Sequence, residues 1–411
     1  MLDPKLLLND LFRAALAAAD PAICVPKHLP PRPKGRMIVV GAGKAAAAMA
    51  AAVEIHYGDE IEGLVITRYG YGAATKWIEV VEAAHPVPDQ AGLDAARRIL
   101  KMVENLSADD FVLFLASGGG SALMSVPAPG IDFTDKQALH KALVLSGANI
   151  SEINTVRKRM SAVKGGRFAA ACGPARIHTL VISDVPGDDP ATVASGPTIR
   201  DTNAPEAVLG ILEKYRIALP ESVRKHLASD ARNLGADHDF SRDCVEVISR
   251  AADALQAAAI RAEANGIEAE ILGDALEGEA REVGAAMAKR ARTLTQRPRV
   301  LLSGGELTVT VKAKGRGGPN TEFLLGLALA LDGNPNIYAL SCDTDGIDGS
   351  EDNAGAIVTP DTLVRAKAAG LDAVQYLTAN DAYGFFKPLG DLVITGPTCT
   401  NVNDFRAVLV T

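Results

Sequence analysis

The sequence predicts an α/β protein in which parallel strands are covered by helices, and three features of the chain support this. Short β-branched runs alternate with longer helical stretches through most of the 411 residues. The apolar run Met37–Val40 leads directly into a glycine turn and an alanine-rich helix, GAGKAAAAM at residues 41–49. Several other apolar runs also end in polar or glycine-rich loops. Strands that alternate with helices in this way are typical of βαβ units.

The expected strands are short apolar runs rich in β-branched residues. They are Met37–Val40, Leu64–Thr67, Glu79–Glu82, Phe111–Ala116, Thr179–Ser183, Val245–Ser249, Glu268–Leu272, Val300–Ser303, Ile337–Ser341 and Leu392–Thr395. Helices expected between them include Ala91–Val103, Asp253–Asn265 and Glu277–Ala291. The stretch GELTVTVKAKGRGG, residues 305–318, alternates like a strand before a glycine-rich loop and so predicts a mixed sheet in the second half.

The length of the chain favours two domains. The best candidate for a domain boundary is a polar stretch without hydrophobic periodicity, SDARNLGADHDFSRD at residues 229–243. We therefore predict one domain over residues 1–240 and a second over residues 241–411.

Composition excludes several classes of function. The formal net charge is −8 and only 4% of residues are aromatic, which argues against a nucleic-acid partner. The five cysteines are scattered and form no C-x-x-C, so we expect reduced thiols and neither a disulfide framework nor a zinc site. Neither a signal peptide nor an apolar span of ~18 residues is recognisable. We expect a soluble, cytoplasmic protein without a membrane partner.

The GAGK turn allows two interpretations. Gly41, Gly43 and Ala46 fit G-x-G-x-x-A, one form of the dinucleotide fingerprint. Lys44, however, adds a cation at a helix N-terminus, where backbone N–H groups attract phosphate. The first interpretation predicts a reductase and the second a phosphoryl-transfer enzyme.

Other strand-end loops carry residues suited to anions, and ligands of open α/β sheets bind beyond the carboxyl ends of the strands. The loop SGGGS supplies small residues, backbone donors and two hydroxyls, so it is a predicted anion site. Its members are Ser117, Gly118, Gly119, Gly120 and Ser121.

A later loop, SGGE, adds Gly304 and Glu306 as predicted substrate or nucleotide contacts. The basic segment RKRMSAVKGGRFA, residues 157–169, is expected to be a mostly solvated helix from which Lys164 reaches a substrate. His85, in the rigid loop AAHPVPDQAG, is expected to be structural rather than catalytic.

Two acidic loops predict a Mg²⁺ site, because Mg²⁺ takes one or two carboxylates together with substrate phosphates. The first holds Asp184, Asp188 and Asp189, and the second holds Asp343, Asp345 and Asp348. Asp and Asn also satisfy the backbone of turns, so we expect one functional aspartate per loop. Asp184, Asp189 and Asp343 are the predicted metal ligands.

The stretch KAKGRGGPNTE, residues 312–322, places Arg316 among glycines. An arginine on such a loop suits the charge of a transferring phosphoryl group. Asn320, a predicted substrate or nucleotide contact, and Thr321 are candidates to cap the helix that follows.

Many ordered motifs, from about residue 10 to the end, resemble the class II glycerate kinases, the glycerate 2-kinase group with a C-terminal MOFRL domain. They include GAGKAAAAM, AAHPVPDQAG, LASGGGSALMSVP, INTVRKRMSAVKGGRFA, ISDVPGDDPATVASGPT, LLSGGELTVTV, GRGGPNTEF, DTDGIDG and GPTCTNVNDF. Lys44 and Arg316 stand where the family has its active-site lysine and arginine, and Asp184 and Asp343 match its acidic loops. These four are the predicted catalytic residues.

The resemblance implies transfer of the ATP γ-phosphoryl group to D-glycerate with Mg²⁺, giving 2-phosphoglycerate and ADP. It also implies a Rossmann-like N-terminal domain, a smaller mixed α/β C-terminal domain and an active site in the cleft between them. The oligomeric state stays open, and a homodimer is compatible with it.

Some family members carry the name hydroxypyruvate reductase, often because they lie in tartrate-degradation gene clusters. An NAD(P)H-dependent reductase is therefore the alternative. An NAD-dependent enzyme of this fold requires an acidic residue at the end of the second strand to bind the ribose. This chain has Arg68 there, which would suit the 2′-phosphate of NADPH instead. A sugar-phosphate sensor is a third hypothesis, but it lacks a recognisable output module.

Overall fold

The computed structural model of the chain describes residues 3–228 and 238–411. Contacts divide the chain into two compact units. The parallel-sheet unit comprises Cys24–Ile248, and the mixed-sheet unit comprises Met1–Ile23 together with Ser249–Thr411. Each is described by itself below.

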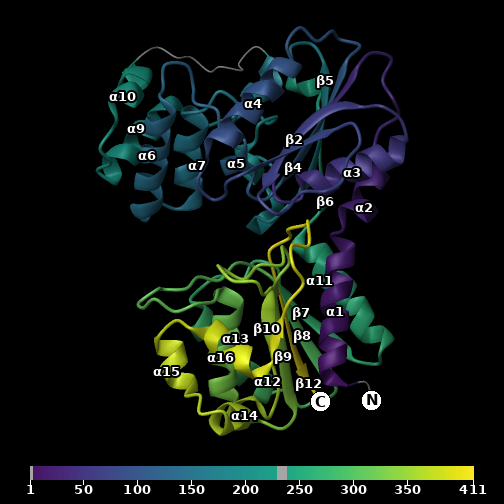
Figure 1. The fold of residues 1–411 in the computed structure, drawn as a ribbon, viewed down its shortest axis with the longest axis vertical. Helices are drawn as coiled ribbons and strands as arrows, with labels where there is room; N and C mark the ends of the chain where they lie inside the picture. Colours follow the sequence, from purple (N-terminus) through teal and green to yellow (C-terminus); the bar gives the residue numbers. More distant parts are fainter. Residues whose placement is uncertain (1–2, 229–237) are drawn as a thin grey trace. The chain divides into compact units, whose positions relative to one another are not determined.

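The parallel-sheet unit is built on a six-stranded sheet in the order β3-β2-β1-β4-β5-β6 (Figure 1). The pairings from β3 through to β5 are all parallel. This is the strand order of a doubly wound dinucleotide-binding fold, which confirms the predicted Rossmann-like architecture. The strands are β1 (Met37–Ala42), β2 (Glu62–Arg68), β3 (Glu79–Ala83), β4 (Phe111–Ser117), β5 (Arg176–Ile182) and β6 (Cys244–Ser249).

Helices cover this sheet, and some of them form a separate group with its own small core. In that group α6, α7, α9 and α10 pack on one another through side chains such as Leu139, Ile153 and Leu212 (Figure 1). The helices after the first strand are α3 (Ala46–Tyr57), α4 (Gln90–Met102), α5 (Gly120–Leu123), α6 (Phe133–Leu145), α7 (Ile150–Arg159), α8 (Arg167–Ala171), α9 (Pro205–Lys214) and α10 (Glu221–Ala228). Single turns of 3₁₀-helix are η1 (Val25–His28), η2 (Pro186–Asp188), η3 (Val193–Ser195) and η4 (Phe240–Arg242).

The mixed-sheet unit has its six strands in the order β11-β10-β9-β12-β8-β7. Only β7 and β8 pair in parallel, and the other pairings are antiparallel, so the predicted mixed sheet is confirmed. Its strands are β7 (Glu268–Gly273), β8 (Arg299–Ser303), β9 (Ile337–Asp343), β10 (Gly355–Val358), β11 (Leu392–Val393) and β12 (Asp404–Val410). Its helices are α1 (Pro4–Ala18), α11 (Ala251–Ala264), α12 (Ala280–Arg292), α13 (Pro319–Leu331), α14 (Thr362–Ala368), α15 (Ala373–Thr378) and α16 (Ala382–Leu389). Between residues 18 and 25 the chain forms α2 (Pro21–Cys24).

Each of the ten predicted strands corresponds to an observed strand, but two strands were missed and one segment was misread. The missed strands are β10 and β12. The alternating segment after residue 305 forms no strand; Thr308 makes one isolated bridge to Glu279, and the rest is loop. The sheet is mixed because β12 runs antiparallel between β8 and β9, not because of that segment.

The two units differ from the predicted ranges 1–240 and 241–411 in two places: Met1–Ile23 belongs to the mixed-sheet unit, and the parallel-sheet unit extends to Ile248. Helix α1 packs against α11 and the mixed sheet, as Figure 1 shows, with the Phe12 and Phe405 rings 5.7 Å apart. An ion pair between Asp10 and Arg261 joins the same two helices. Buried apolar side chains on one face of α1, among them Leu8 and Leu11, explain why it folds with the mixed sheet. Part of the predicted boundary segment, residues 229–237, lies outside the described residues.

None of the five cysteines forms a disulfide. Among the described residues, no helix is both long and apolar enough to cross a membrane.

Candidate functional site

The GAGK and SGGGS loops meet at the point where the strand order of the parallel sheet reverses. Strands β1 and β4 are parallel neighbours, and their loops continue in contact beyond the carboxyl ends. The backbone N–H of Lys44 donates to the carbonyl of Gly118 at 2.8 Å, and the N–H of Ala45 donates to Ser117 Oγ at 3.0 Å. Ligands of doubly wound sheets bind at this switch point.

The glycines of the GAGK turn are required by this close packing. Gly43 has a φ of +148°, and an added Cβ would lie 2.0 Å from Ser117 Oγ. At Gly41 an added Cβ would lie 2.1 Å from the carbonyl oxygen of Leu115. Gly41 therefore allows the close pairing of β1 and β4, and Gly43 lets the GAGK turn approach Ser117, whether or not a ligand approaches them as well.

The N–H groups of this turn are already used by the protein. Besides those of Lys44 and Ala45, the N–H of Gly43 donates to Ile66 at 3.1 Å, and that of Ala46 donates to the carbonyl of Gly43 at 3.1 Å. A dinucleotide fingerprint offers such N–H groups to the pyrophosphate. The G-x-G-x-x-A pattern here serves loop packing instead.

Side chains from two other loops lie around Gly119. A Cβ added there would lie 3.1 Å from His85 Nε2 and 3.5 Å from Lys44 Cγ. Lys44 and His85 are both partly buried. The predicted catalytic lysine therefore lies beside the predicted anion loop, and His85, expected to be structural, lies at the same place.

A cavity of about 770 Å³ opens next to this group. His85, Gly119, Ser121 and Asp184 line one part of it, at the carboxyl ends of the strands. Helices α6 and α7 line most of the rest, with apolar side chains and with the cations Lys136 and Arg157, and the turn after α7 adds Lys164. The size suits a small-molecule ligand.

The three cations are bound to neutral groups. Lys164, which is 2% exposed, donates to the carbonyls of Ser121 at 2.6 Å and Met124 at 3.3 Å. Lys136 donates to the carbonyl of Val126 at 2.9 Å, and Arg157 contacts the ring of His140. Within residues 3–228 and 238–411, no carboxylate forms an ion pair with any of the three.

Burial disfavours the charged forms of Lys136, Arg157, Lys164 and His140, so it lowers their pKa values. Burial, with a contribution from Arg157, lowers the pKa of Lys136 to about 7. Burial also lowers the pKa of Arg157 to about 10, and burial together with the nearby cations lowers the pKa of His140 to about 4. The pKa of Lys164 lies well below its ordinary value because of burial and the two neighbouring cations. An anion bound here would supply the missing countercharge.

A hydroxyl chain links the SGGGS loop to the loop after β5. The hydroxyls of Ser121 and Ser195 are 2.8 Å apart, and Ser195 Oγ donates to Asn154 Oδ1 at 3.3 Å. Ala194 and Ser195 have φ values of +52° and +62°, which residues with a Cβ seldom adopt. Such backbone strain is found most often at ligand sites.

The other predicted residues of this unit have different surroundings. Ser117 is fully buried and accepts from Ala45, so its hydroxyl holds the two loops together. Asp184 is partly buried and lines the cavity. Asp189 is exposed and accepts from Ala191 N–H at 3.0 Å and Thr192 Oγ1 at 3.2 Å, within its own turn.

The expectation that residues 157–169 form a mostly solvated helix is wrong. Helix α7 ends at Arg159, and Lys158, Lys164 and Arg167 are 9% exposed or less. The segment turns inward because Lys164 and Arg167 donate to buried backbone carbonyls, which an exposed helix would not offer.

In the mixed-sheet unit, the predicted catalytic residues lie on loops. Arg316 is exposed, with its guanidinium 5.1 Å from the centre of the Tyr383 ring and within 4 Å of Asp381 and Glu351. Asp343 is partly buried at the end of β9, where it accepts from the N–H of Asp345 at 2.8 Å.

A buried network surrounds the predicted contacts Asn320 and Gly304. Asn320 is 1% exposed, and its amide donates to Asp404 at 2.7 Å. The guanidinium of Arg406, fully buried, donates to Asp404 and to the carbonyl of Gly304. Glu306 is exposed.

Asp348 completes this network at the start of α13. It accepts from the N–H groups of Asn320 and Thr321, both at 2.9 Å, and from Thr321 Oγ1 at 2.7 Å. Asp348, rather than Asn320 or Thr321 alone, therefore caps this helix. Burial raises the pKa of Asp348 to about 6.

Sequence reasoning missed Lys136, His140, Arg157, Asn154 and Ser195. One signal was present in α6, where Lys136, His140 and Leu143 follow helical spacing and share a face with Leu139. A lysine on the apolar face of a helix indicates either a buried partner or a ligand.

Comparisons with known proteins identify the family of the chain. A family model described as a domain of unknown function (DUF4147) matches residues 7–228, and the MOFRL family model matches residues 299–404. The chain is 40% identical to the D-glycerate 2-kinase of Thermotoga maritima, with 100% of each chain covered. It is 50% identical to an Agrobacterium vitis protein with the provisional name hydroxypyruvate reductase, over 98% of this chain and 94% of that one.

Among solved structures, the crystal structure of the Thermotoga maritima glycerate kinase matches with a TM-score of 0.90 at 40% identity, covering 99% of each chain. These matches span both units and the motifs of both. The chain belongs to the glycerate kinase family whose C-terminal part is a MOFRL domain.

Proposed function

We propose that the protein is a glycerate 2-kinase, which transfers the γ-phosphoryl group of ATP to the 2-hydroxyl of D-glycerate. The observation that carries the proposal is the cationic cavity beside Lys44 and the SGGGS loop, since it offers charge to a small anion. The name and full-length similarity of the Thermotoga maritima D-glycerate 2-kinase support the choice of substrate.

The carboxylate of glycerate is the group that the buried cations would hold. Lys136, Arg157 and Lys164 line the cavity without a protein carboxylate as partner in the described part of the chain. A charge-assisted hydrogen bond to a carboxylate is stronger than one to a neutral carbonyl. Gly119 and Ser121 would then lie beside the hydroxyl end of the substrate.

Phosphoryl transfer then needs positioning and charge stabilisation rather than covalent help from the protein. The 2-hydroxyl oxygen forms a bond to the γ-phosphorus, the bond to the β–γ bridging oxygen breaks, and the hydroxyl proton goes to a carboxylate. Lys44 and Arg316 are the proposed cations for the transferring group. Asp184, which lines the cavity, is the proposed proton acceptor, and Asp343 is the alternative.

Carboxylate oxygens of Asp184 and Asp343 fit the hard-oxygen preference of Mg²⁺. When bound, Mg²⁺ would neutralise charge on the ATP phosphates. Asp189 fits less well, because both of its carboxylate oxygens accept hydrogen bonds within its own turn.

Hydroxypyruvate reduction is the second candidate, because the name of the Agrobacterium vitis relative points to it. It requires the GAGK turn to hold a pyrophosphate. The four N–H groups of residues 43–46 donate to protein acceptors, which weighs against that role.

Two assays on one purified sample separate the candidates. The first mixes ATP, Mg²⁺ and D-glycerate, measures ADP and identifies the phosphoglycerate by phosphorus NMR. The second follows absorbance with NADH or NADPH and hydroxypyruvate. We expect ADP and 2-phosphoglycerate, with activity lost in Lys44→Ala and kept in Lys101→Ala, an exposed lysine of α4. Nicotinamide oxidation without ADP release would instead make the protein a reductase.

A further inference from the structure

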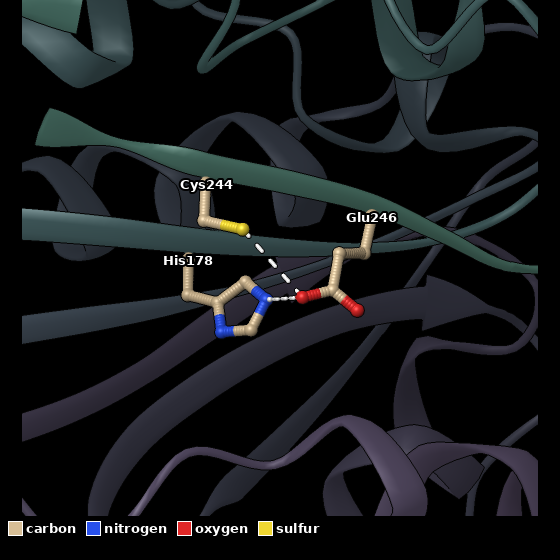
Figure 2. A group of neighbouring side chains, drawn as sticks. All are labelled: His178, Cys244 and Glu246. Atoms are coloured by element: carbon tan, nitrogen blue, oxygen red, sulfur yellow. Dashed lines mark hydrogen bonds and ion pairs between the residues drawn. The ribbon is translucent and has the colours of Figure 1, made fainter. Parts of the chain in front are cut away.

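A cluster of metal-binding side chains lies on the parallel sheet, away from the candidate active site. His178 comes from β5, and Cys244 and Glu246 come from the neighbouring strand β6 (Figure 2). Residues two apart on a strand point to the same face, so Cys244 and Glu246 face the same way. His178 lies six residues before Asp184, a span of roughly 20 Å along an extended chain.

The ligand atoms of the three side chains are already close together. One atom from each lies within 4.8 Å of the others. His178 Nε2 is 3.0 Å from Glu246 Oε1, and Cys244 Sγ is 3.5 Å from the same oxygen, as the dashed lines of Figure 2 mark. Ligands of a tetrahedral ion with bonds of about 2.0–2.3 Å are roughly 3.4–3.7 Å apart, so small side-chain rotations suffice.

A fourth side chain fixes the carboxylate from its other side. His28, at the end of η1, places Nδ1 2.7 Å from Glu246 Oε2. A histidine that hydrogen-bonds the second oxygen of a coordinating carboxylate orients it toward the ion.

We propose that His178, Cys244 and Glu246 bind one divalent transition-metal ion of the Zn²⁺ type, with water as the fourth ligand and His28 positioning the carboxylate. Nitrogen, sulfur and oxygen donors together suit Zn²⁺ or Co²⁺, whereas Mg²⁺ and Ca²⁺ require oxygens. The ion clamps β6, an edge strand, to β5. The site is therefore structural and does not depend on the proposed kinase activity.

The protonation of the cluster gives the site a pH dependence. Burial, with the neighbouring Glu246, raises the pKa of the Cys244 thiol, and Arg176 opposes this. Only the thiolate binds, so metal binding releases the thiol proton and the affinity rises with pH.

The expectation from sequence was that these cysteines form no zinc site. That expectation followed from spacing, since no C-x-x-C occurs. His178 and Glu246 are 68 residues apart, and only strand pairing brings them together.

The test uses the full-length chain without a histidine tag, treated with chelator and titrated with Co²⁺. We expect one equivalent to bind with a thiolate-to-cobalt charge-transfer band, displaced by Zn²⁺ and not by Mg²⁺. Zn²⁺ at 100-fold over its Kd should raise the Tm by about 5 °C. Binding should strengthen about tenfold per pH unit while the thiol is protonated.

Three variants and one control decide the assignment. Cys244→Ser should abolish the charge-transfer band, and His178→Gln should weaken Co²⁺ binding by at least about 100-fold. His28→Gln should weaken it about 10–100-fold. Cys399→Ser, also a partly buried thiol, should change nothing. A band that survives in Cys244→Ser, or no binding at all, would overturn the proposal, while a circular dichroism spectrum like that of the metal-free wild type would show that Cys244→Ser folds.

Discussion

Both units bury charged side chains, but the partners of these side chains differ between the units. In the mixed-sheet unit, Asp348, Asp404 and Arg406 are 6% exposed or less, and each is hydrogen-bonded or ion-paired to other side chains or backbone groups of this unit. In the parallel-sheet unit, Lys136 and Lys164 are also buried, at 7% and 2% exposed, yet their partners are neutral carbonyls.

We interpret this difference as one of role: the charges of the mixed-sheet unit stabilise the fold, and the cations of the parallel-sheet unit are the proposed binding groups for an anion. A buried ion pair that is fully hydrogen-bonded fixes the geometry of its surroundings, and breaking it costs several kcal/mol. A buried cation without a countercharge lowers stability instead, and it is retained where it binds an anion. The four predictions below test this distinction.

The largest effect is expected for Lys164→Met. Removing a buried cation that holds the substrate carboxylate should lower kcat/KM by about 10²–10³-fold, mainly through KM. Steady-state kinetics with varied D-glycerate measure this, with Lys101→Met as the control. A kcat/KM within threefold of wild type would mean that the cavity does not bind the substrate.

Asp348→Ala should instead act on stability. It leaves the buried N–H groups of Asn320 and Thr321 without these acceptors, and it leaves the Thr321 hydroxyl with only the carbonyl of Gly318. We expect the free energy of unfolding to fall by about 2–4 kcal/mol in urea. Glu282→Ala, at an exposed position of α12, is the matched control. An equal effect of both would contradict a structural role for the network.

The fold could be predicted largely from local pattern, because strands that alternate with helices leave few possible topologies. The two missed strands, β10 and β12, lacked such a pattern. Strand β10 has only four residues and follows an acidic loop, and β12 follows a polar motif without a turn signal that marks its start. The segment after residue 305 alternates, but in the structure most of it forms a loop.

The candidate site could be predicted only in part. The glycine-rich loops and Lys44 carry local signals, and the structure brings them together at the switch point. The cation cluster had no such signal, since Lys136 lies on α6 and Arg157 on α7. Whether a lysine is paired depends on neighbours from other elements, and spacing along the chain does not give those.

A third prediction concerns pH and the unpaired cations. The pKa of Lys136 is about 7 in the fold and about 10.5 when exposed, so above pH 7 the unfolded chain holds this proton more tightly. The free energy of unfolding should therefore rise with pH, by about 1–2 kcal/mol between pH 7.5 and 9.

Substrate binding should change in the opposite direction, because an anion binds the protonated lysine. The KM for glycerate should rise about tenfold between pH 7 and 8.5. Urea unfolding and kinetics at matched pH values measure the two trends, to which Lys164 also contributes because burial lowers its pKa. Arg157, with a pKa of about 10, stays charged over this range, and His140, with a pKa of about 4, stays neutral. Lys136→Met should flatten both, and unchanged slopes in this variant would show that another group titrates.

The smallest effect is expected at Asp189, where the predicted metal ligand is also a turn residue. Its two oxygens accept from Ala191 and Thr192, and the side chain is exposed. Asp189→Asn should therefore change kcat by less than about threefold and stability by about 0.5–1 kcal/mol. Asp184→Asn, in the cavity, should lower kcat by about 10²-fold or more if it takes the hydroxyl proton. Measuring kcat at several Mg²⁺ concentrations separates the roles of Asp184 and Asp189. If Asp189→Asn requires more Mg²⁺ than wild type, Asp189 is a metal ligand, and an exposed turn residue then belongs to the functional site.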